Sequence, residues 1–285
     1  MTLSGVIGSV SWLEAIILGI VQGLTEFLPI SSSAHLLILS RLTGWGDPGA
    51  AFTAVTQIGT ELAVIIYLRH DIVRIAKAWL HSLRDQSARS SIDARMGWYV
   101  IIGSLPILIL GFLFRHSIET VARNLWLVAF NLIIFGVILG VCDALGRRTK
   151  KVDDLNARDG ILYGLGQALA LIPGVSRSGA TISMGLALGY TRESAARYSF
   201  LLAIPAVLAS GLFEALNIGS DTTAAWGPTL LATAIAFVVG YLVIAWLLRY
   251  LVSNTFLPFV IYRIALGLLL IILLLFGVVS ATVPQ

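Results

Sequence analysis

Long apolar segments constrain the fold of this chain more than any other feature of its sequence. Six of them approach the roughly 20 residues that cross a bilayer as an α-helix, and they cover residues 51–69, 97–115, 124–145, 197–217, 226–248 and 256–278. Hydrophobic residues make up 58% of the 285 positions and charged residues only 12%, which is too apolar for a soluble domain of this size. The sequence therefore predicts an all-α, polytopic membrane protein, surrounded by lipid, with one membrane domain over residues 1–285.

Polar residues interrupt the apolar sequence near the N-terminus. Gln22 and Glu26 lie four residues apart, so a helix places both side chains on one face. Pro29 breaks that helix, and Ser31–Ser33 are favourable N-cap residues for a second one. The pattern predicts a helix, a break and a second helix, with the amide groups at the second helix's N-terminus free to bind an anion.

The same pattern recurs later in the chain. A shift of 145 positions without a gap places Gly19, Gln22, Leu24, Ser31 and Ser33 on Gly164, Gln167, Leu169, Ser176 and Ser178. The two breaks also fall in register, and the second copy carries Arg177 where the first has Ser32. We therefore predict two broken helical pairs inside two sequence repeats. The pairs are 5–28 with 32–43 and 160–172 with 178–189, and the repeats cover about 5–145 and about 158–279.

Basic residues gather in two segments between the apolar runs, at 70–96 and 146–158. By the positive-inside rule both segments are cytoplasmic loops, so the net charge of +4 reports membrane topology and no nucleic-acid partner is expected. Glu14 is expected near the outer interface. Three crossings in each repeat would invert one repeat relative to the other. The two broken pairs would then be re-entrant from opposite sides, with their tips together near the middle of the membrane.

This arrangement would place Glu26, Ser32, His35 and Arg177 within reach of one ligand. Oxygen atoms of Glu26 and Gln22 on one helical face suit a hard divalent cation, Mg²⁺ or Ca²⁺, with substrate phosphates completing its coordination. For Gln22, a structural hydrogen bond between helices is the competing interpretation. The single cysteine of the chain excludes a metal site with several cysteine ligands.

Arg177 is the strongest candidate for binding phosphate, because a guanidinium group can donate two parallel hydrogen bonds to it. The start of the following helix would complete an anion-binding cradle. The candidate phosphate-binding residues are Ser33, Gly174, Ser176, Ser178 and Thr181. A buried ion pair between Arg177 and Glu26 is the alternative, and it would also describe an empty resting state. Arg263, inside the last apolar run, is expected to have a structural pairing role.

Ser32 becomes a candidate nucleophile if a base lies close to it. His35 follows about one helical turn later, and it is the only histidine near the break. Direct attack by a water molecule, oriented by Glu26 and His35, fits the same residues equally well.

These residues resemble a known family, the undecaprenyl pyrophosphate phosphatases, also called bacitracin-resistance proteins. One motif runs from Gln22 and Glu26 into Leu-Pro-x-Ser-Ser-x-x-His, and the other is Pro-Gly-x-Ser-Arg-Ser-x-x-Thr, here Pro173–Thr181. Gln57-Ile58-Gly59 and Tyr262-Arg263 are also similar to the family's pattern. Gln22 stands at a position where the family has glutamate or glutamine, which weakens its case as an anionic metal ligand.

The resemblance implies a hydrolase of the bacterial plasma membrane. Such an enzyme removes one phosphate from the C55 polyprenyl pyrophosphate and so regenerates the carrier lipid for cell-wall synthesis. It also implies a divalent cation, bacitracin resistance and a site that opens to the extracytoplasmic side. A polyprenyl-phosphate transporter or flippase is the alternative function, because inverted repeats with broken helices also form transporters. The formation of a homodimer, the identity of the cation and the selectivity for chain length stay open.

Overall fold

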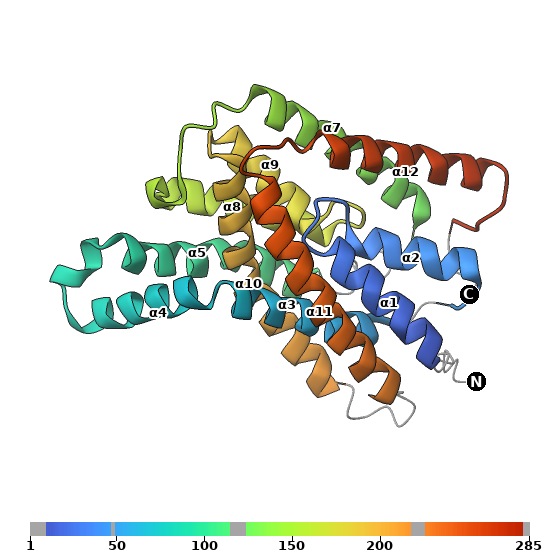
Figure 1. Cartoon of the computed structure of the whole chain (residues 1–285), viewed down its shortest axis with the longest axis horizontal. Coiled ribbons are helices and arrows are strands. Elements are labelled where there is room, and N and C mark those ends of the chain that lie inside the picture. Colours follow the sequence, from blue (N-terminus) through green and yellow to red (C-terminus); the bar gives the residue numbers. More distant parts are fainter. Residues whose placement is uncertain (1–9, 47–48, 115–123, 218–225, 282–285) are drawn as a thin grey trace.

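The computed structural model describes residues 10–46, 49–114, 124–217 and 226–281, and within these ranges the fold is helical (Figure 1). The α-helices are α1 (Trp12–Thr25), α2 (Ser32–Thr43), α3 (Gly49–Tyr67), α4 (Arg69–Arg84), α5 (Ile92–Leu113), α7 (Leu125–Leu145), α8 (Ala157–Ala168), α9 (Arg177–Ala187), α10 (Arg192–Asn217), α11 (Trp226–Tyr250) and α12 (Leu257–Leu275). Short 3-10 turns are η1 (Ser87–Ser90), η2 (Val152–Asp154) and η3 (Leu169–Leu171). The all-α prediction is confirmed for the described residues.

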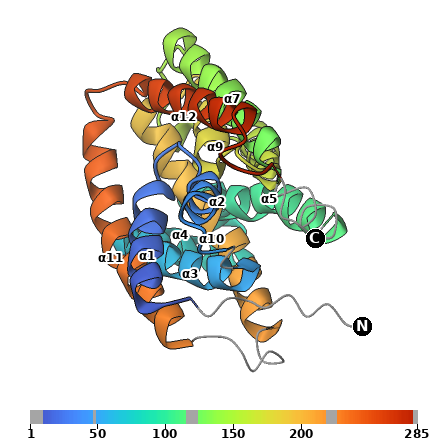
Figure 2. The same ribbon diagram turned by 90° about the vertical axis from the view of Figure 1, so that its right-hand side faces the viewer.

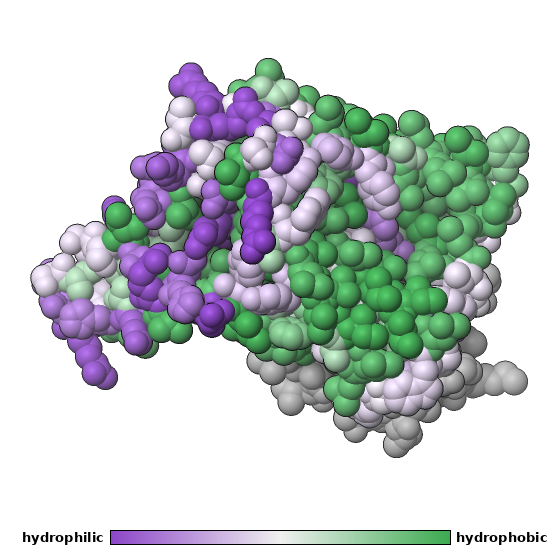
Figure 3. Space-filling model, viewed as in Figure 1, coloured by the Kyte–Doolittle hydropathy of each residue, from purple (hydrophilic) through white to green (hydrophobic). Residues whose placement is uncertain are grey.

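Five helices in the described part of the chain, α5, α7, α10, α11 and α12, are long and apolar enough to cross a membrane. Large hydrophobic side chains stay exposed along α5, α7, α11 and α12, as expected where lipid is the solvent, whereas α10 is mostly buried inside the protein. Figure 3 shows the hydrophobic surface over α11 and α12, with hydrophilic residues gathered at the end that carries α4. The chain is therefore a multi-pass membrane protein. The predicted sixth crossing corresponds to α3, whose apolar part Phe52–Tyr67 is shorter.

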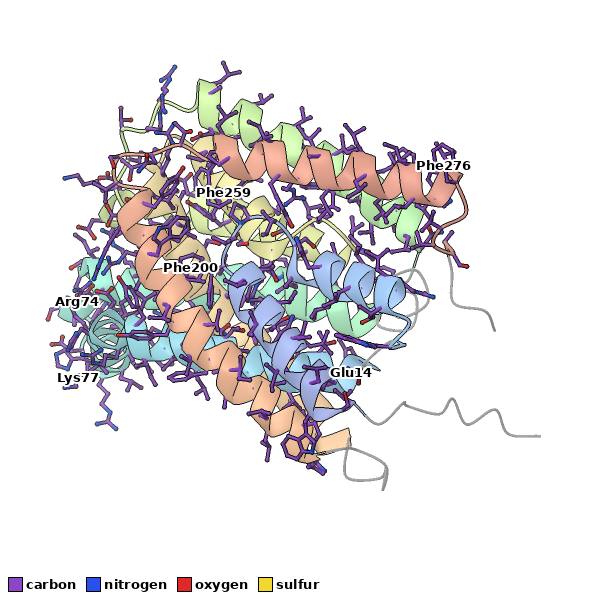
Figure 4. The ribbon with its side chains drawn as sticks, turned by 45° about the vertical axis from the view of Figure 1, so that its right-hand side comes forward. Glu14, Arg74, Lys77, Phe200, Phe259 and Phe276 are labelled. Carbon is purple, nitrogen blue, oxygen red and sulfur yellow. The ribbon has the colours of Figure 1, made fainter. Side chains whose placement is uncertain are left out.

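The basic segment 70–96, predicted as a loop, is mostly helical in the structure. It contains α4, which folds back against α5 so that the two helices form a hairpin (Figure 1). Trp79 packs directly on Gly97, where a side chain would overlap the indole ring. One face of α4 is apolar and the other charged, so its helical form follows from packing that a count of basic residues does not detect. Arg74 and Lys77 of this helix lie far from Glu14 at the opposite side of the molecule (Figure 4).

The two broken pairs have the same backbone geometry, as the sequence repeat predicts. Ser31 precedes α2 with φ 75°, and Ser176 precedes α9 with φ 71°. Each serine hydroxyl accepts a hydrogen bond from the amide three residues later. Each also lies 3.2 Å from the hydroxyl two residues later, on Ser33 and Ser178 respectively. A positive φ is strained for serine, so both breaks hold the chain in a conformation that the surrounding packing enforces.

Helix packing also follows the repeat. Helix α1 of the first repeat lies on α11 of the second, and α8 of the second repeat lies on α5 of the first. Gly19 faces Ala232 in the first contact and Gly164 faces Gly103 in the second, and a Cβ atom on either glycine would overlap the facing backbone. Small residues permit this close approach, which is a common way to join helices in membranes. Helices α7 and α12 pack side by side across one edge of the fold (Figure 2).

Candidate functional site

The two breaks meet inside the protein. Arg177, the first residue of α9, donates a hydrogen bond from Nη2 to Oε1 of Glu26 at 2.7 Å, and Glu26 lies at the C-terminal end of α1. Both side chains are largely buried, with side-chain exposures of 16% for Arg177 and 4% for Glu26. Residues 151 positions apart in the sequence therefore form one ion pair. This is also the alternative described above, in which the two side chains pair in an empty site.

The carboxylate of Glu26 is the centre of this site. Its Oε2 atom accepts hydrogen bonds from Nε2 of Gln22 at 2.8 Å and from the hydroxyl of Ser32 at 2.7 Å, while Oε1 accepts from Arg177. Gln22 reaches it because the two residues lie one turn apart on α1, and Ser32 because α2 begins directly after the break. A hydroxyl bonded to a buried carboxylate has a proton acceptor in place.

His35 does not have the partner that its spacing suggested. Its Nδ1 atom lies 2.7 Å from the carbonyl oxygen of Ser31, and its Nε2 atom lies 2.7 Å from the hydroxyl of Tyr262. Nδ1 donates to the carbonyl oxygen, which can only accept, and in the neutral ring Nε2 then accepts from the hydroxyl of Tyr262. The hydroxyl of Ser32 instead donates to Glu26. The spacing of Ser32 and His35 could not reveal this, because the competing partner Tyr262 lies 227 residues away from the histidine.

The hydroxyl groups predicted to bind phosphate hold the second break in place. Ser178 donates to the carbonyl oxygen of Leu28 at 3.1 Å and so links the two breaks. Thr181 donates to the carbonyl oxygen of Arg177 at 2.8 Å, and its hydroxyl also contacts that of Ser199. The hydroxyl of Ser176 caps α9. The role of these three hydroxyl groups toward a ligand stays a prediction.

Ser33 and Gly174, the other two predicted phosphate-binding residues, lie in different surroundings. Ser33 is exposed, and its hydroxyl pairs with that of Ser31. Gly174 is buried with φ 84°, and a Cβ atom there would lie 2.7 Å from the carbonyl oxygen of Val128 on α7. Glycine is therefore required at the second break by its backbone angle and by the close approach of α7.

Arg263 has the structural role expected from the sequence, although its partners are carbonyl groups and not a carboxylate. The side chain is fully buried. Its guanidinium donates to the carbonyl oxygens of Pro29 at 2.9 Å and Gly174 at 3.0 Å, one from each break. Further bonds reach the carbonyl oxygens of Asn131, Leu132 and Val175. Arg263 thus holds both breaks and α7 together in a region where an unbonded carbonyl would be costly.

Glu61 is a further residue of the site that the sequence patterns did not single out. It lies on α3, is fully buried, and has Oε2 at 3.8 Å from Nη2 of Arg177. Neither of its carboxylate oxygens has a hydrogen-bond partner within the described residues. The signal was present in the sequence, since a carboxylate inside the apolar run 51–69 is expensive unless it faces a cavity or a charged partner.

An apolar groove of about 610 Å³ lies beside the second break. The end of α5, the end of α8 and the segment after it up to Pro173 line the groove. Among its lining residues are Leu110, Phe114, Leu165, Leu171 and Met184. The groove therefore places an apolar wall directly beside the second break, since its lining residue Pro173 precedes Gly174.

Fold and site together define a multi-pass membrane protein that holds a buried arginine, carboxylates and a serine hydroxyl where two interrupted helices meet. The family model described as "Bacitracin resistance protein BacA" matches residues 15–269, and the chain belongs to this family.

Curated relatives are similar over nearly the whole chain. "Undecaprenyl-diphosphatase" of Renibacterium salmoninarum is 59% identical over 276 residues, which cover 95% of this chain and 99% of that protein. "Undecaprenyl-diphosphatase" of a Nocardioides species is 57% identical and covers 95% and 100% of the two chains. "Undecaprenyl-diphosphatase 2" of Frankia casuarinae is 60% identical, with 95% and 97% covered.

Proposed function

We propose that this protein is an undecaprenyl-diphosphatase, which hydrolyses undecaprenyl diphosphate to undecaprenyl phosphate and inorganic phosphate. Relatives with this name cover almost the entire chain, and the family is described by bacitracin resistance. Among the structural observations, the partly buried contact of Glu26 with both Arg177 and Ser32 carries the proposal. It unites a cation for the phosphate, a hydroxyl nucleophile and a proton acceptor in one place. Recycling of the carrier lipid for cell-wall synthesis follows from the reaction.

In the proposed reaction, Arg177 and the N-termini of α2 and α9 bind the diphosphate and neutralise its charge. Most of the catalysis of phosphoryl transfer comes from such positioning and charge stabilisation. The oxygen of Ser32 attacks the terminal phosphorus, its proton passes to Glu26, and the bridging P–O bond breaks to release undecaprenyl phosphate. Water then hydrolyses the phosphoserine. Direct attack by water is the alternative to this covalent route.

The structure supports Glu26, and not His35, as the acceptor of the Ser32 proton. Glu26 already receives this hydrogen bond, whereas both ring nitrogens of His35 are engaged by Ser31 and Tyr262. We therefore assign His35 no proton transfer in the first step and keep it as the candidate base for the later hydrolysis. Hydrogen bonds around catalytic groups often rearrange when substrate binds, so His35 stays within the proposed site.

A divalent cation, Mg²⁺ or Ca²⁺, fits the oxygen donors around Glu26. Gln22 supports this, because its Oε1 atom is buried and has no hydrogen-bond partner within the described residues. Glu26 and Gln22 would hold the ion, which would supply charge neutralisation for the transferred phosphoryl group. The described residues contain no group of three or more His, Cys, Asp or Glu side chains placed to hold a metal ion. Oxygen atoms of the substrate would therefore have to complete the coordination.

The apolar groove lined by Pro173 suits the polyprenyl tail, because its walls are apolar and it lies beside the break that precedes Arg177. We further propose that α3 is the sixth crossing and that the two broken pairs are re-entrant from opposite sides of the plasma membrane. The site then opens to the extracytoplasmic side. The hydrophilic residues gathered over α4 support a cytoplasmic position for that end (Figure 3).

Phosphate release in detergent tests this function, because transport has no meaning where no membrane separates two sides. The purified protein is expected to release phosphate from undecaprenyl diphosphate, and Ser32→Ala is expected to reduce the rate by roughly 10²-fold or more. Ser90→Ala, in an exposed turn on η1, is the matched control and should keep the parent rate. A parent protein that moves polyprenyl phosphate across vesicle membranes without releasing phosphate would support the flippase alternative.

A further inference from the structure

Glu61 is a buried carboxylate whose position is not explained by hydrogen bonds to its neighbours. Its side chain is fully buried on α3, and both carboxylate oxygens lack a hydrogen-bond partner within the described residues. Burial of a charged group without hydrogen bonds opposes folding, so buried carboxylates normally have close partners. The fully buried Arg263 shows the contrast, because its guanidinium is bonded to five carbonyl oxygens.

The charged neighbour of Glu61 is a guanidinium group that another carboxylate already binds. Nη2 of Arg177 lies 2.7 Å from Oε1 of Glu26 and 3.8 Å from Oε2 of Glu61. The first distance is a strong hydrogen bond, whereas the second is too long for one. This nitrogen atom therefore lies close to two carboxylates and forms a hydrogen bond with only one of them.

The position of this nitrogen atom, close to oxygen atoms of two carboxylates, suits a positive charge. Arg177 fills it in the absence of substrate, but the proposed reaction requires the guanidinium to bind the diphosphate. Once the guanidinium moves, Glu26 and Glu61 face each other without a counter-charge. A divalent cation suits this place, since carboxylate oxygens coordinate Mg²⁺ or Ca²⁺ at about 2.0 to 2.6 Å. The carboxylates would draw closer than they are around the guanidinium.

We propose that Glu61 is the second carboxylate ligand of the active-site cation, and that the cation takes the place Arg177 leaves when substrate binds. The inference rests on the proposed function. It supplies the negative charge that Gln22 does not carry, and it uses carboxylate oxygens that the resting structure leaves without hydrogen bonds. Cation and diphosphate then bind cooperatively. The diphosphate draws the guanidinium away from the two carboxylates, and the cation restores the positive charge beside them.

Binding of Mn²⁺ to the purified full-length protein in detergent, followed by electron paramagnetic resonance, tests this inference without relying on turnover. Farnesyl methylenediphosphonate, which resists hydrolysis, serves as the substrate analogue. We expect the analogue to tighten Mn²⁺ binding by the parent at least 10-fold. Glu61→Gln should weaken Mn²⁺ binding at least 10-fold in the presence of the analogue, and Glu61→Asp should weaken it less. Glu14→Gln, which changes a glutamate in the cap of α1, should bind as the parent does.

Thermal unfolding distinguishes two roles of Glu61: a ligand of the cation and a structural ion-pair partner of Arg177. A ligand role predicts that Glu61→Gln unfolds at a higher temperature than the parent without cation and loses most of the stabilisation that Mn²⁺ gives to the parent. A structural ion pair instead predicts a lower unfolding temperature and an unchanged response to Mn²⁺, and that result overturns the inference. If Glu26→Gln loses Mn²⁺ binding while Glu61→Gln keeps it, the inference fails and the proposed function stands. If the parent binds no Mn²⁺ and resists chelators, both the inference and the proposed cation fail.

Discussion

Ser31 and Ser176 lie 145 positions apart and hold the same unusual backbone conformation, with φ values of 75° and 71°. Each one caps the helix that follows it. Strain at a single residue can arise by chance, but the same strain at equivalent points of two repeats indicates that both breaks need this shape. With this backbone conformation at both breaks, α2 and α9 begin at the same site.

This strain predicts an unusual order of substitutions at Ser176. Ser176→Ala loses the cap and keeps the disfavoured positive φ, and we expect it to lower the free energy of unfolding by about 1 to 2 kcal/mol or more. Ser176→Gly also loses the cap, but glycine accepts the backbone angle, so its effect should be a few tenths of a kcal/mol.

Denaturant unfolding in detergent measures both Ser176 variants. Ser91, which caps α5 with φ −64°, provides the matched control. The difference between the alanine and glycine variants should be larger at Ser176 than at Ser91. Equal differences at the two positions would contradict a strained break.

Arg177→Lys is expected to lose most of the activity. Lysine keeps the positive charge, but a single ammonium group cannot place two parallel hydrogen bonds on a phosphate. We expect phosphate release to fall by roughly 10- to 100-fold, about 1.4 to 2.8 kcal/mol in the transition state. The assay is phosphate release from undecaprenyl diphosphate in detergent. Arg249→Lys, at an exposed position on α11, controls for the loss of an arginine. Near-normal turnover of Arg177→Lys would contradict the proposal that Arg177 donates two parallel hydrogen bonds to the substrate phosphate.

Glu26→Gln is expected to remove the proton acceptor of Ser32 and a ligand of the cation together. The amide can still accept a hydrogen bond from Arg177, so the change should leave the fold largely intact. We expect activity to fall by roughly 10²- to 10⁴-fold, and the residual rate to depend little on a chelator. Phosphate release with C55 and shorter diphosphates, with and without chelator, measures both effects. A variant that stays fully active and chelator-sensitive would exclude Glu26 as base and as ligand.

Arg263→Met is expected to destabilise the protein without touching the substrate. The change leaves carbonyl oxygens of Pro29, Gly174 and their neighbours buried and without hydrogen bonds. We expect the free energy of unfolding to fall by about 3 to 5 kcal/mol. Arg263→Lys should recover only part of this, because three donors cannot replace the planar fork. Arg249→Met is the exposed control, and an equal loss of stability in both methionine variants would contradict the proposed role.

The sequence predicted the parts of the site that depend on local pattern. Pro29 and the Pro173–Gly174 pair marked both breaks, and the shift of 145 positions placed them in equivalent positions. An odd number of crossings in each repeat then predicted that the two tips meet, and the hydrogen bond between Glu26 and Arg177 agrees with that prediction. The roles of these side chains in catalysis stay predictions.

Contacts between distant segments were not predictable from the same patterns. Tyr262 holds His35 from the last helix, and no spacing rule relates residues so far apart. Glu61 was overlooked because a single carboxylate does not disturb the hydropathy of the run 51–69. The helical form of α4 was missed because a count of basic residues describes membrane topology and not packing.

The network around Arg263 restricts how the site can open. One guanidinium fastens the tips of both broken pairs to α7, so the tips cannot separate without breaking several buried hydrogen bonds at once. A movement of the surrounding helices that keeps these bonds would change access to the site while the two breaks stay together. Separation of the breaks themselves would instead leave the carbonyl oxygens that Arg263 binds without partners.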